Sequence, residues 1–133
     1  MSLRLFFSAL LFLTIGCAYA SDERYDAITK ECHATGTLSP ACYSKYLKQS
    51  SNELNKLLLS ISSRNSLVSK FLKGNQKKWS AYVTEWCEDS VSMDGDIGVA
   101  QNNACLIYFT LARIRDLREH YCEFEDCPRP EGR

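Results

Sequence analysis

The sequence lacks a second long hydrophobic run, strand-like alternation and an excess of charge of either sign. After residue 15, no segment approaches the roughly 20 apolar residues that a membrane-spanning helix needs. No stretch alternates apolar and polar residues for long enough to indicate a β-strand. The chain carries 16 basic and 16 acidic residues, which argues against general nucleic-acid binding.

Histidine is also scarce, which limits metal and catalytic chemistry. Only His33 and His120 are present, and no two cysteines have C-x-x-C spacing, so we expect no metal and no other cofactor. His120 falls in the charged last turn of a predicted helix, where a histidine usually contributes a favourable helix-end charge. Glu88 and Asp89 could act as an acid and base pair, but carboxylates on a polar turn are usually only solvated. We therefore expect a binding protein and not an enzyme.

Residues 1–20 are typical of a signal peptide. Arg4 supplies a positive charge, residues 5–15 are apolar, and Ala18-Tyr19-Ala20 is a small-x-small cleavage site. Thr14 to Cys17 partly resembles a bacterial lipoprotein box, but the usual leucine three residues before the cysteine is missing. We expect cleavage after Ala20 and a periplasmic or secreted protein, with lipid anchoring through Cys17 as the alternative.

Residues 21–133 are enough for one domain and too few for two, and we divide them into a helical domain, 21–121, and an irregular tail, 122–133. Apolar residues recur at helical spacing in three segments: about 40–60, 65–87 and 96–121. Ser39 before Pro40 fits a helix N-cap and first helical position. A shorter first helix ends near Gly36. The predicted fold is all-α: an antiparallel bundle of three long helices with the short N-terminal helix across one end.

Six cysteines follow the leader, and an even count in a small exported chain indicates a disulfide framework. Fifteen pairings are possible, and we favour those that a single turn brings together. The predicted pairs are Cys32 with Cys42, Cys87 with Cys105, and Cys122 with Cys127. The second pair would leave the start of the last helix, and the turn before it, projecting beyond the end of the preceding helix.

Several residues between Cys32 and Leu117 resemble the LprI-like family of lysozyme inhibitors, which are small exported bacterial proteins. The most specific are Gln76-x-x-Trp79-x-x-Tyr82, then Cys87, a glycine-containing turn, and Cys105-x-x-x-x-Thr110-x-x-Arg113-x-x-x-Leu117. Leu54-Asn55 and the Cys32 and Cys42 pair match as well. Ser51 and Val83-Thr84 depart from the pattern, in which Asp and Arg-Asp are common. The resemblance implies a disulfide-bonded exported protein and names lysozyme as a possible target class.

The motif residues have structural explanations of their own. Trp79, Tyr82 and Trp86 fall on one helical stripe and are predicted to lie in the core. Gln76 and Arg113 lie beside the stripes of their helices, so we expect them to meet at a buried edge. Gly74, inside a helix, could mark a close helix crossing.

The charge distribution gives the clearest functional signal. Between residues 30 and 84 there are nine basic residues against Glu31 and Glu53, whereas residues 85–98 carry five acids and no base. These acids, on the predicted projecting turn, are Glu85, Glu88, Asp89, Asp94 and Asp96. The alternative is an ordinary solvated turn, but an acidic tip would suit a basic protein partner. We predict an inhibitor of lysozyme or a related cell-wall hydrolase; the alternatives are an accessory envelope protein and a peptidoglycan or small-ligand binding module.

Overall fold

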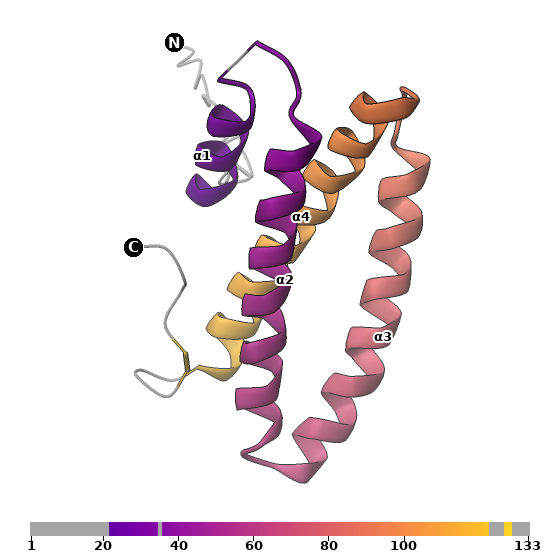
Figure 1. The fold of residues 1–133 in the computed structure, drawn as a ribbon. Helices are drawn as coiled ribbons and strands as arrows, with labels where there is room; N and C mark the ends of the chain where they lie inside the picture. Colours follow the sequence, from indigo (N-terminus) through magenta and orange to yellow (C-terminus); the bar gives the residue numbers. More distant parts are fainter. Residues whose placement is uncertain (1–21, 35, 123–126, 129–133) are drawn as a thin grey trace, which may run out of the picture.

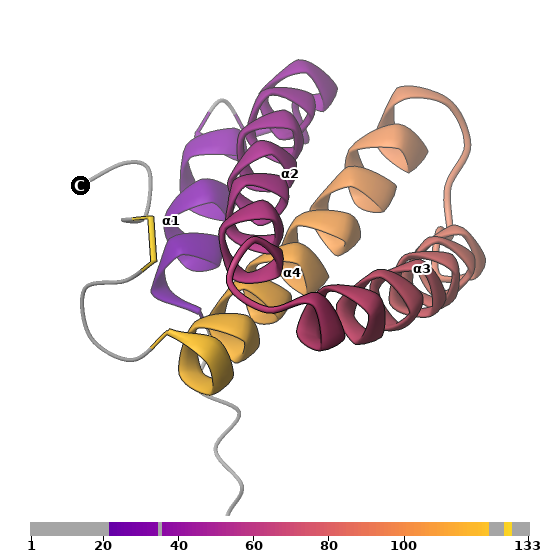
Figure 2. The ribbon, with the colours of Figure 1, turned by 90° about the horizontal axis from the view of Figure 1, so that it is seen from below.

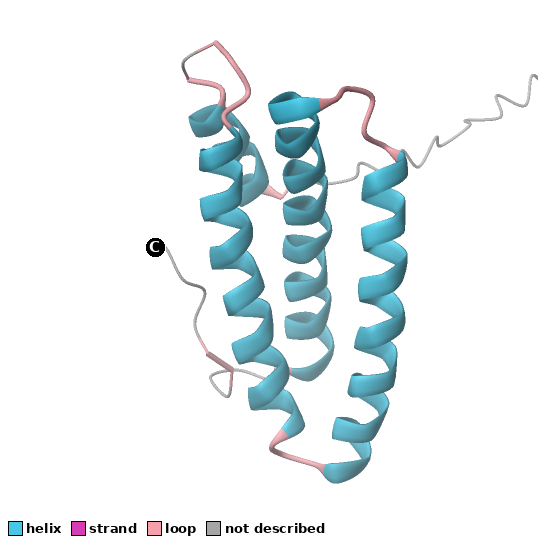
Figure 3. Cartoon of the chain, turned by 45° about the vertical axis from the view of Figure 1, so that its right-hand side comes forward, coloured by secondary structure: helices cyan, strands magenta, loops and turns pink. Residues whose placement is uncertain are grey.

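The computed structural model describes residues 22–34, 36–122 and 127–128, and within them the chain forms helices joined by loops (Figure 3). The helices are α1 (Glu23–Cys32), α2 (Pro40–Ser62), α3 (Ser66–Asp89) and α4 (Gly95–Tyr121). None of these described helices is long and apolar enough to cross a bilayer. The predicted signal peptide, with Cys17, lies outside the described residues, as does most of the predicted tail.

Consecutive helices run in opposite directions, which confirms the predicted all-α antiparallel bundle (Figure 1). Most contacts between helices join α2 to α4, whereas α3 stands at one side of this pair and α1 at the other (Figure 2). We predicted that the short helix α1 would lie across one end of the bundle. It lies instead alongside the N-terminal half of α2. The disulfide between Cys32 and Cys42, with a Cα–Cα distance of 5.5 Å, joins the two helices.

Side-chain caps explain where the helices begin. Ser39 accepts a hydrogen bond from the Cys42 amide at 3.3 Å, and Pro40 follows as the first helical residue, as predicted. Asn65 Oδ1 accepts hydrogen bonds from two amides of the first turn of α3. Gly36 has a φ of +78°, a backbone conformation that favours glycine, so the chain can turn from α1 into α2. The predicted helix from 65 to 87 extends two residues further, to Asp89.

The core lies mainly between α2 and α4. Fully buried side chains of this pair include Leu57 and Ile61 on α2 and Ile107, Leu111 and Leu117 on α4. In contrast, α3 buries only Leu72, Val83 and Cys87. The helix α3 is therefore held to the bundle by few apolar contacts, a disulfide and the polar contacts described below.

Two sequence predictions about α3 are wrong. Trp79 packs partly buried against the core, but Tyr82 and Trp86 are 57% and 52% exposed. The adjacent Val83 faces the core in place of Tyr82. The face of α3 that packs against the bundle is rotated by about one residue from the stripe of aromatic side chains. Gly74 marks no close crossing within the described chain, since a Cβ added there would have no neighbouring atom within 4 Å.

Candidate partner-binding surface

The connection between α3 and α4 forms a projecting tip, which we define as residues 85–98. The predicted disulfide between Cys87 and Cys105 is present, with a Cα–Cα distance of 5.7 Å. Because α4 begins ten residues before Cys105, at Gly95, its first turns extend beyond the end of α3 (Figure 1). The covalent bond holds the base of this extension.

The loop inside the tip is fixed by polar contacts and by close packing. At the C-terminal end of α3, the Ser90 hydroxyl donates to the carbonyl of Trp86 at 2.7 Å. Gln101 Oε1 accepts a hydrogen bond from the amide of Ser92 at 3.4 Å. A Cβ at the buried Gly98 would lie 2.1 Å from the carbonyl oxygen of Met93, so the loop backbone rests directly on α4 at this glycine. These contacts give the tip a defined shape.

Exposed acidic and apolar side chains cover the tip. All five predicted acids are exposed, and no ion pair joins any of them to another described residue; they are Glu85, Glu88, Asp89, Asp94 and Asp96. Large apolar side chains lie among them: Trp86 and Met93 are each 52% exposed, Val99 beside the tip is 50% exposed, and Ile97 is 44% exposed. Apolar groups with charged neighbours are typical of protein-binding surfaces.

The motif residues in the middle of α3 and α4 meet, as predicted. Arg113 donates from Nε to Oε1 of Gln76 at 3.3 Å and from Nη2 to Oδ1 of Asn75. The same guanidinium lies 5.8 Å from the ring centroid of Trp79. Buried Thr110 bonds back to the carbonyl of Leu106 in its own helix. The three contacts of Arg113 join α4 to α3, whereas the Thr110 hydrogen bond stays within α4.

Sequence reasoning missed a buried ionic cluster around Glu53. Glu53 is 4% exposed and binds Arg24 at 2.8 Å and Arg118 at 3.3 Å, so one carboxylate joins α1, α2 and α4. The signal was present in the sequence: Glu53 lies between Ser50 and Leu57 on the apolar stripe of α2, where a charged residue needs buried partners.

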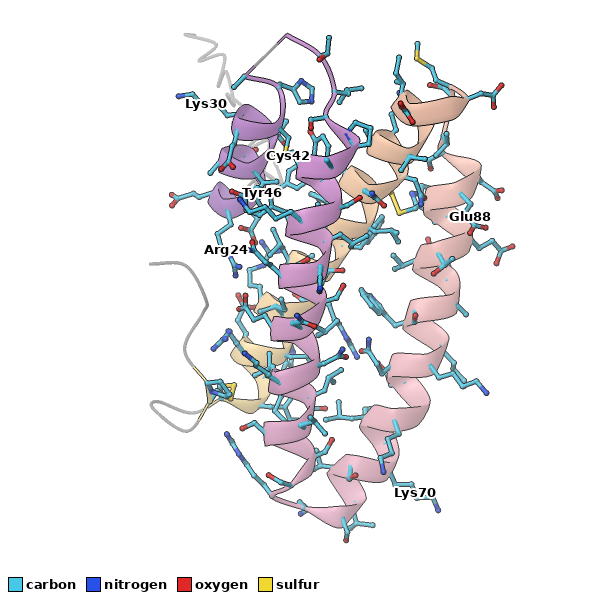
Figure 4. All side chains as sticks on the ribbon, viewed as in Figure 1. Arg24, Lys30, Cys42, Tyr46, Lys70 and Glu88 are labelled. Carbon is cyan, nitrogen blue, oxygen red and sulfur yellow. A yellow bond between two sulfur atoms is a disulfide. The ribbon has the colours of Figure 1, made fainter. Side chains whose placement is uncertain are left out.

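A groove of about 390 Å³ lies between α1 and α2, beside this cluster. Figure 4 shows Arg24 and Tyr46 at this boundary. The Tyr46 hydroxyl donates to Glu31, and this hydrogen bond is the main reason why the pKa of Tyr46 is raised. Among the described residues that line the groove, Tyr46 is the only aromatic one.

Both histidines contact groups within the helical bundle. The His33 ring packs edge-on to Tyr43, with centroids 6.0 Å apart, beside the Cys32 and Cys42 disulfide. His120 Nδ1 lies 2.7 Å from the carbonyl oxygen of Asp116 in the last turns of α4. The described residues contain no group of three or more side chains suited to hold a metal ion.

The sequence matches the model of a known protein family. The family model described as lysozyme inhibitor LprI covers residues 29–117, which include the tip, the Arg113 contacts and both disulfides of the helical region. The chain belongs to the LprI family of lysozyme inhibitors. No curated protein and no solved structure matches the chain. Because LprI is an inhibitor family, membership points to action by binding a protein partner.

Proposed function

We propose that the exported, oxidised protein binds and inhibits a lysozyme or a related cell-wall hydrolase through its tip. Family membership supplies the class of target. The observation that supports the location is the projecting acidic and apolar surface of residues 85–98, whose base is closed by the Cys87 and Cys105 disulfide. A rigid projection loses little conformational entropy on binding, which favours affinity.

The two kinds of side chain on the tip have different roles in this proposal. Exposed carboxylates attract a basic protein and speed its encounter, and they lose this effect as salt screens them. The apolar side chains Met93 and Ile97 would be buried in the complex and would slow its dissociation. The acids therefore act on the association rate, and the apolar residues on the dissociation rate.

The test is a kinetic comparison of two charge-matched variants. The tip variant replaces Glu88, Asp89, Asp94 and Asp96 by Ser. The control replaces four exposed carboxylates outside the tip by Ser: Glu23, Asp26, Asp116 and Glu119. Both change the net charge equally, so only a local effect separates them.

We expect the tip variant to keep its helical circular dichroism, to associate about tenfold more slowly at low salt and to lose salt dependence. The control should bind a susceptible lysozyme like the wild type. Met93→Ser with Ile97→Ser should instead raise the dissociation rate. If the wild-type protein leaves several lysozyme types active at micromolar excess, the inhibitor proposal fails; if inhibition survives in the tip variant, the tip is not the site.

A further inference from the structure

The helix α3 has a second apolar face, which lies beside the face that it buries in the bundle. Leu67, Phe71, Tyr82 and Trp86 are 77%, 63%, 57% and 52% exposed. At 100° per residue these four positions fall on one side of the helix, and we define them as the outer face; Gly74, Asn75 and Lys78 lie between the two pairs. Each of these residues is more than half exposed, and α3 lies at the edge of the bundle (Figures 1 and 2).

The order of charged residues along α3 is unfavourable for the stability of the helix by itself. Lys70, Lys73 and Lys77 lie in its first half and Lys78 just past its midpoint, whereas Glu85, Glu88 and Asp89 occupy its last two turns. This order opposes the helix macrodipole, which favours acids at the N-terminus and bases at the C-terminus. It also places like charges four residues apart, and no described ion pair compensates for them. Figure 4 shows Lys70 and Glu88 near opposite ends of α3.

A shallow depression of about 460 Å³ lies on the same face, around Gly74. Phe71, Asn75 and Lys78 are among its other lining residues. A glycine inside a helix costs about 1 kcal/mol relative to alanine, and no contact within the described chain requires one at this position. A helix from outside the chain that crosses here would explain it.

We propose that the outer face of α3 binds the same face of a second copy of this chain, with the two α3 helices antiparallel. A two-fold axis between residues 76 and 77 places Leu67 opposite Trp86 and Phe71 opposite Tyr82, because each pair is equidistant from that midpoint. Side chains on a helix lean towards its N-terminus. The Tyr82 ring of the second copy would therefore enter the depression beside Gly74.

The charges on α3 favour a second copy of the chain as the partner, and they favour antiparallel over parallel helices. In the antiparallel arrangement Lys70 lies about 3 Å along the axis from Glu85 of the second copy, on the same flank of the interface. A parallel arrangement would place lysines opposite lysines. A two-fold interface must be complementary to itself, and the basic and acidic halves of α3 meet this condition.

The dimer should be modest in strength. Four large apolar side chains from each copy, with the stems of the flanking lysines, bury on the order of 1,000 Å², near the lower limit for specific interfaces. The two copies of Lys78 lie near the two-fold axis and repel each other. We therefore expect a micromolar dissociation constant. The outer face shares Trp86 with the tip, but the proposal does not rest on the proposed function, and association is measured without any hydrolase.

The first experiment is sedimentation equilibrium of the mature oxidised chain from about 1 µM to about 500 µM. The wild type should shift from monomer to dimer over this range. Phe71→Ser with Tyr82→Ser should weaken association at least about tenfold. Leu59→Ser is the matched control, because Leu59 is 72% exposed on α2 and should not affect association. All variants should keep the wild-type circular dichroism, since the replaced side chains are exposed.

The second experiment tests the direction of the helices. Lys70→Glu and Glu85→Lys should each remain monomeric, because each homodimer would carry two like-charged contacts. An equimolar mixture of the two variants should associate, since every Lys70 and Glu85 contact then joins opposite charges. A wild type that stays monomeric at about 500 µM overturns the proposal, as does a dimer that none of these variants weakens. A mixture that stays monomeric rejects the antiparallel arrangement.

Discussion

Arg113 on α4 donates from Nε to Oε1 of Gln76 on α3 at 3.3 Å, while its guanidinium lies 5.8 Å from the ring centroid of Trp79. This contact joins the middle of α3 to the rest of the bundle, where α3 buries few apolar side chains of its own. The Cys87 and Cys105 disulfide fixes one end of the same helix. These two connections, together with the few apolar side chains that α3 buries, hold α3 and the tip in place.

We expect Arg113→Ala to lower the free energy of unfolding by about 2 kcal/mol, because it removes two charged hydrogen bonds and the contact with the Trp79 ring. Urea unfolding followed by circular dichroism measures this loss. Arg115→Ala is the control: its ion pair with Asp22 spans 4.0 Å at a half-exposed site, and its removal should cost less than about 1 kcal/mol. Equal losses in the two variants would refute the structural role of Arg113.

Glu53 provides a test of coupling. With Arg24→Ala or Arg118→Ala alone, the buried carboxylate keeps one guanidinium partner, and each change should cost about 1–2 kcal/mol. The double variant leaves Glu53 buried without a charged partner and should cost about 3–5 kcal/mol, more than the sum of the single changes. A double-mutant cycle of urea unfolding measures the excess. Strict additivity would show that Glu53 is not held by both arginines together.

The sequence predicted features that depend on local signals. Ser39 with Pro40 indicated the start of α2, and the three predicted pairs of cysteines form disulfides. The contact between Gln76 and Arg113 followed from their places beside two apolar stripes.

Other features depend on which neighbour each helix finds, and the sequence did not reveal them. Val83 and Tyr82 are adjacent and both apolar enough for a core, and only the crossing of α3 against α4 decides which one faces inward. The partners of Glu53 are 29 and 65 residues away in sequence, so no local pattern indicates them.

Gly98→Ala should disturb the tip. The added methyl group would lie 2.1 Å from the backbone carbonyl oxygen of Met93, so the loop must move as a whole. We expect a loss of about 1–3 kcal/mol and faster amide exchange in residues 91–94 than in the wild type. Gly74→Ala is the matched control, because its methyl group meets open space within a helix; in dilute solution it should raise stability by about 0.5–1 kcal/mol. Unchanged amide exchange in Gly98→Ala would contradict the close packing of this loop.

Replacing each of the two tryptophans in turn should separate effects on folding from effects on binding. Trp79 packs against the core and beside Arg113 but keeps some exposure, so Trp79→Ala should cost about 2–3 kcal/mol, less than a fully buried tryptophan. Trp86 is 52% exposed, and Trp86→Ala should change the unfolding free energy by no more than about 0.5 kcal/mol. Because Trp86 lies on both the tip and the outer face of α3, its loss should instead weaken target binding and self-association. Thermal unfolding at low concentration, sedimentation and inhibition assays of the same two variants measure each effect. A Trp79→Ala variant with wild-type stability and no target binding would place the aromatic contact at the partner interface and not in the core.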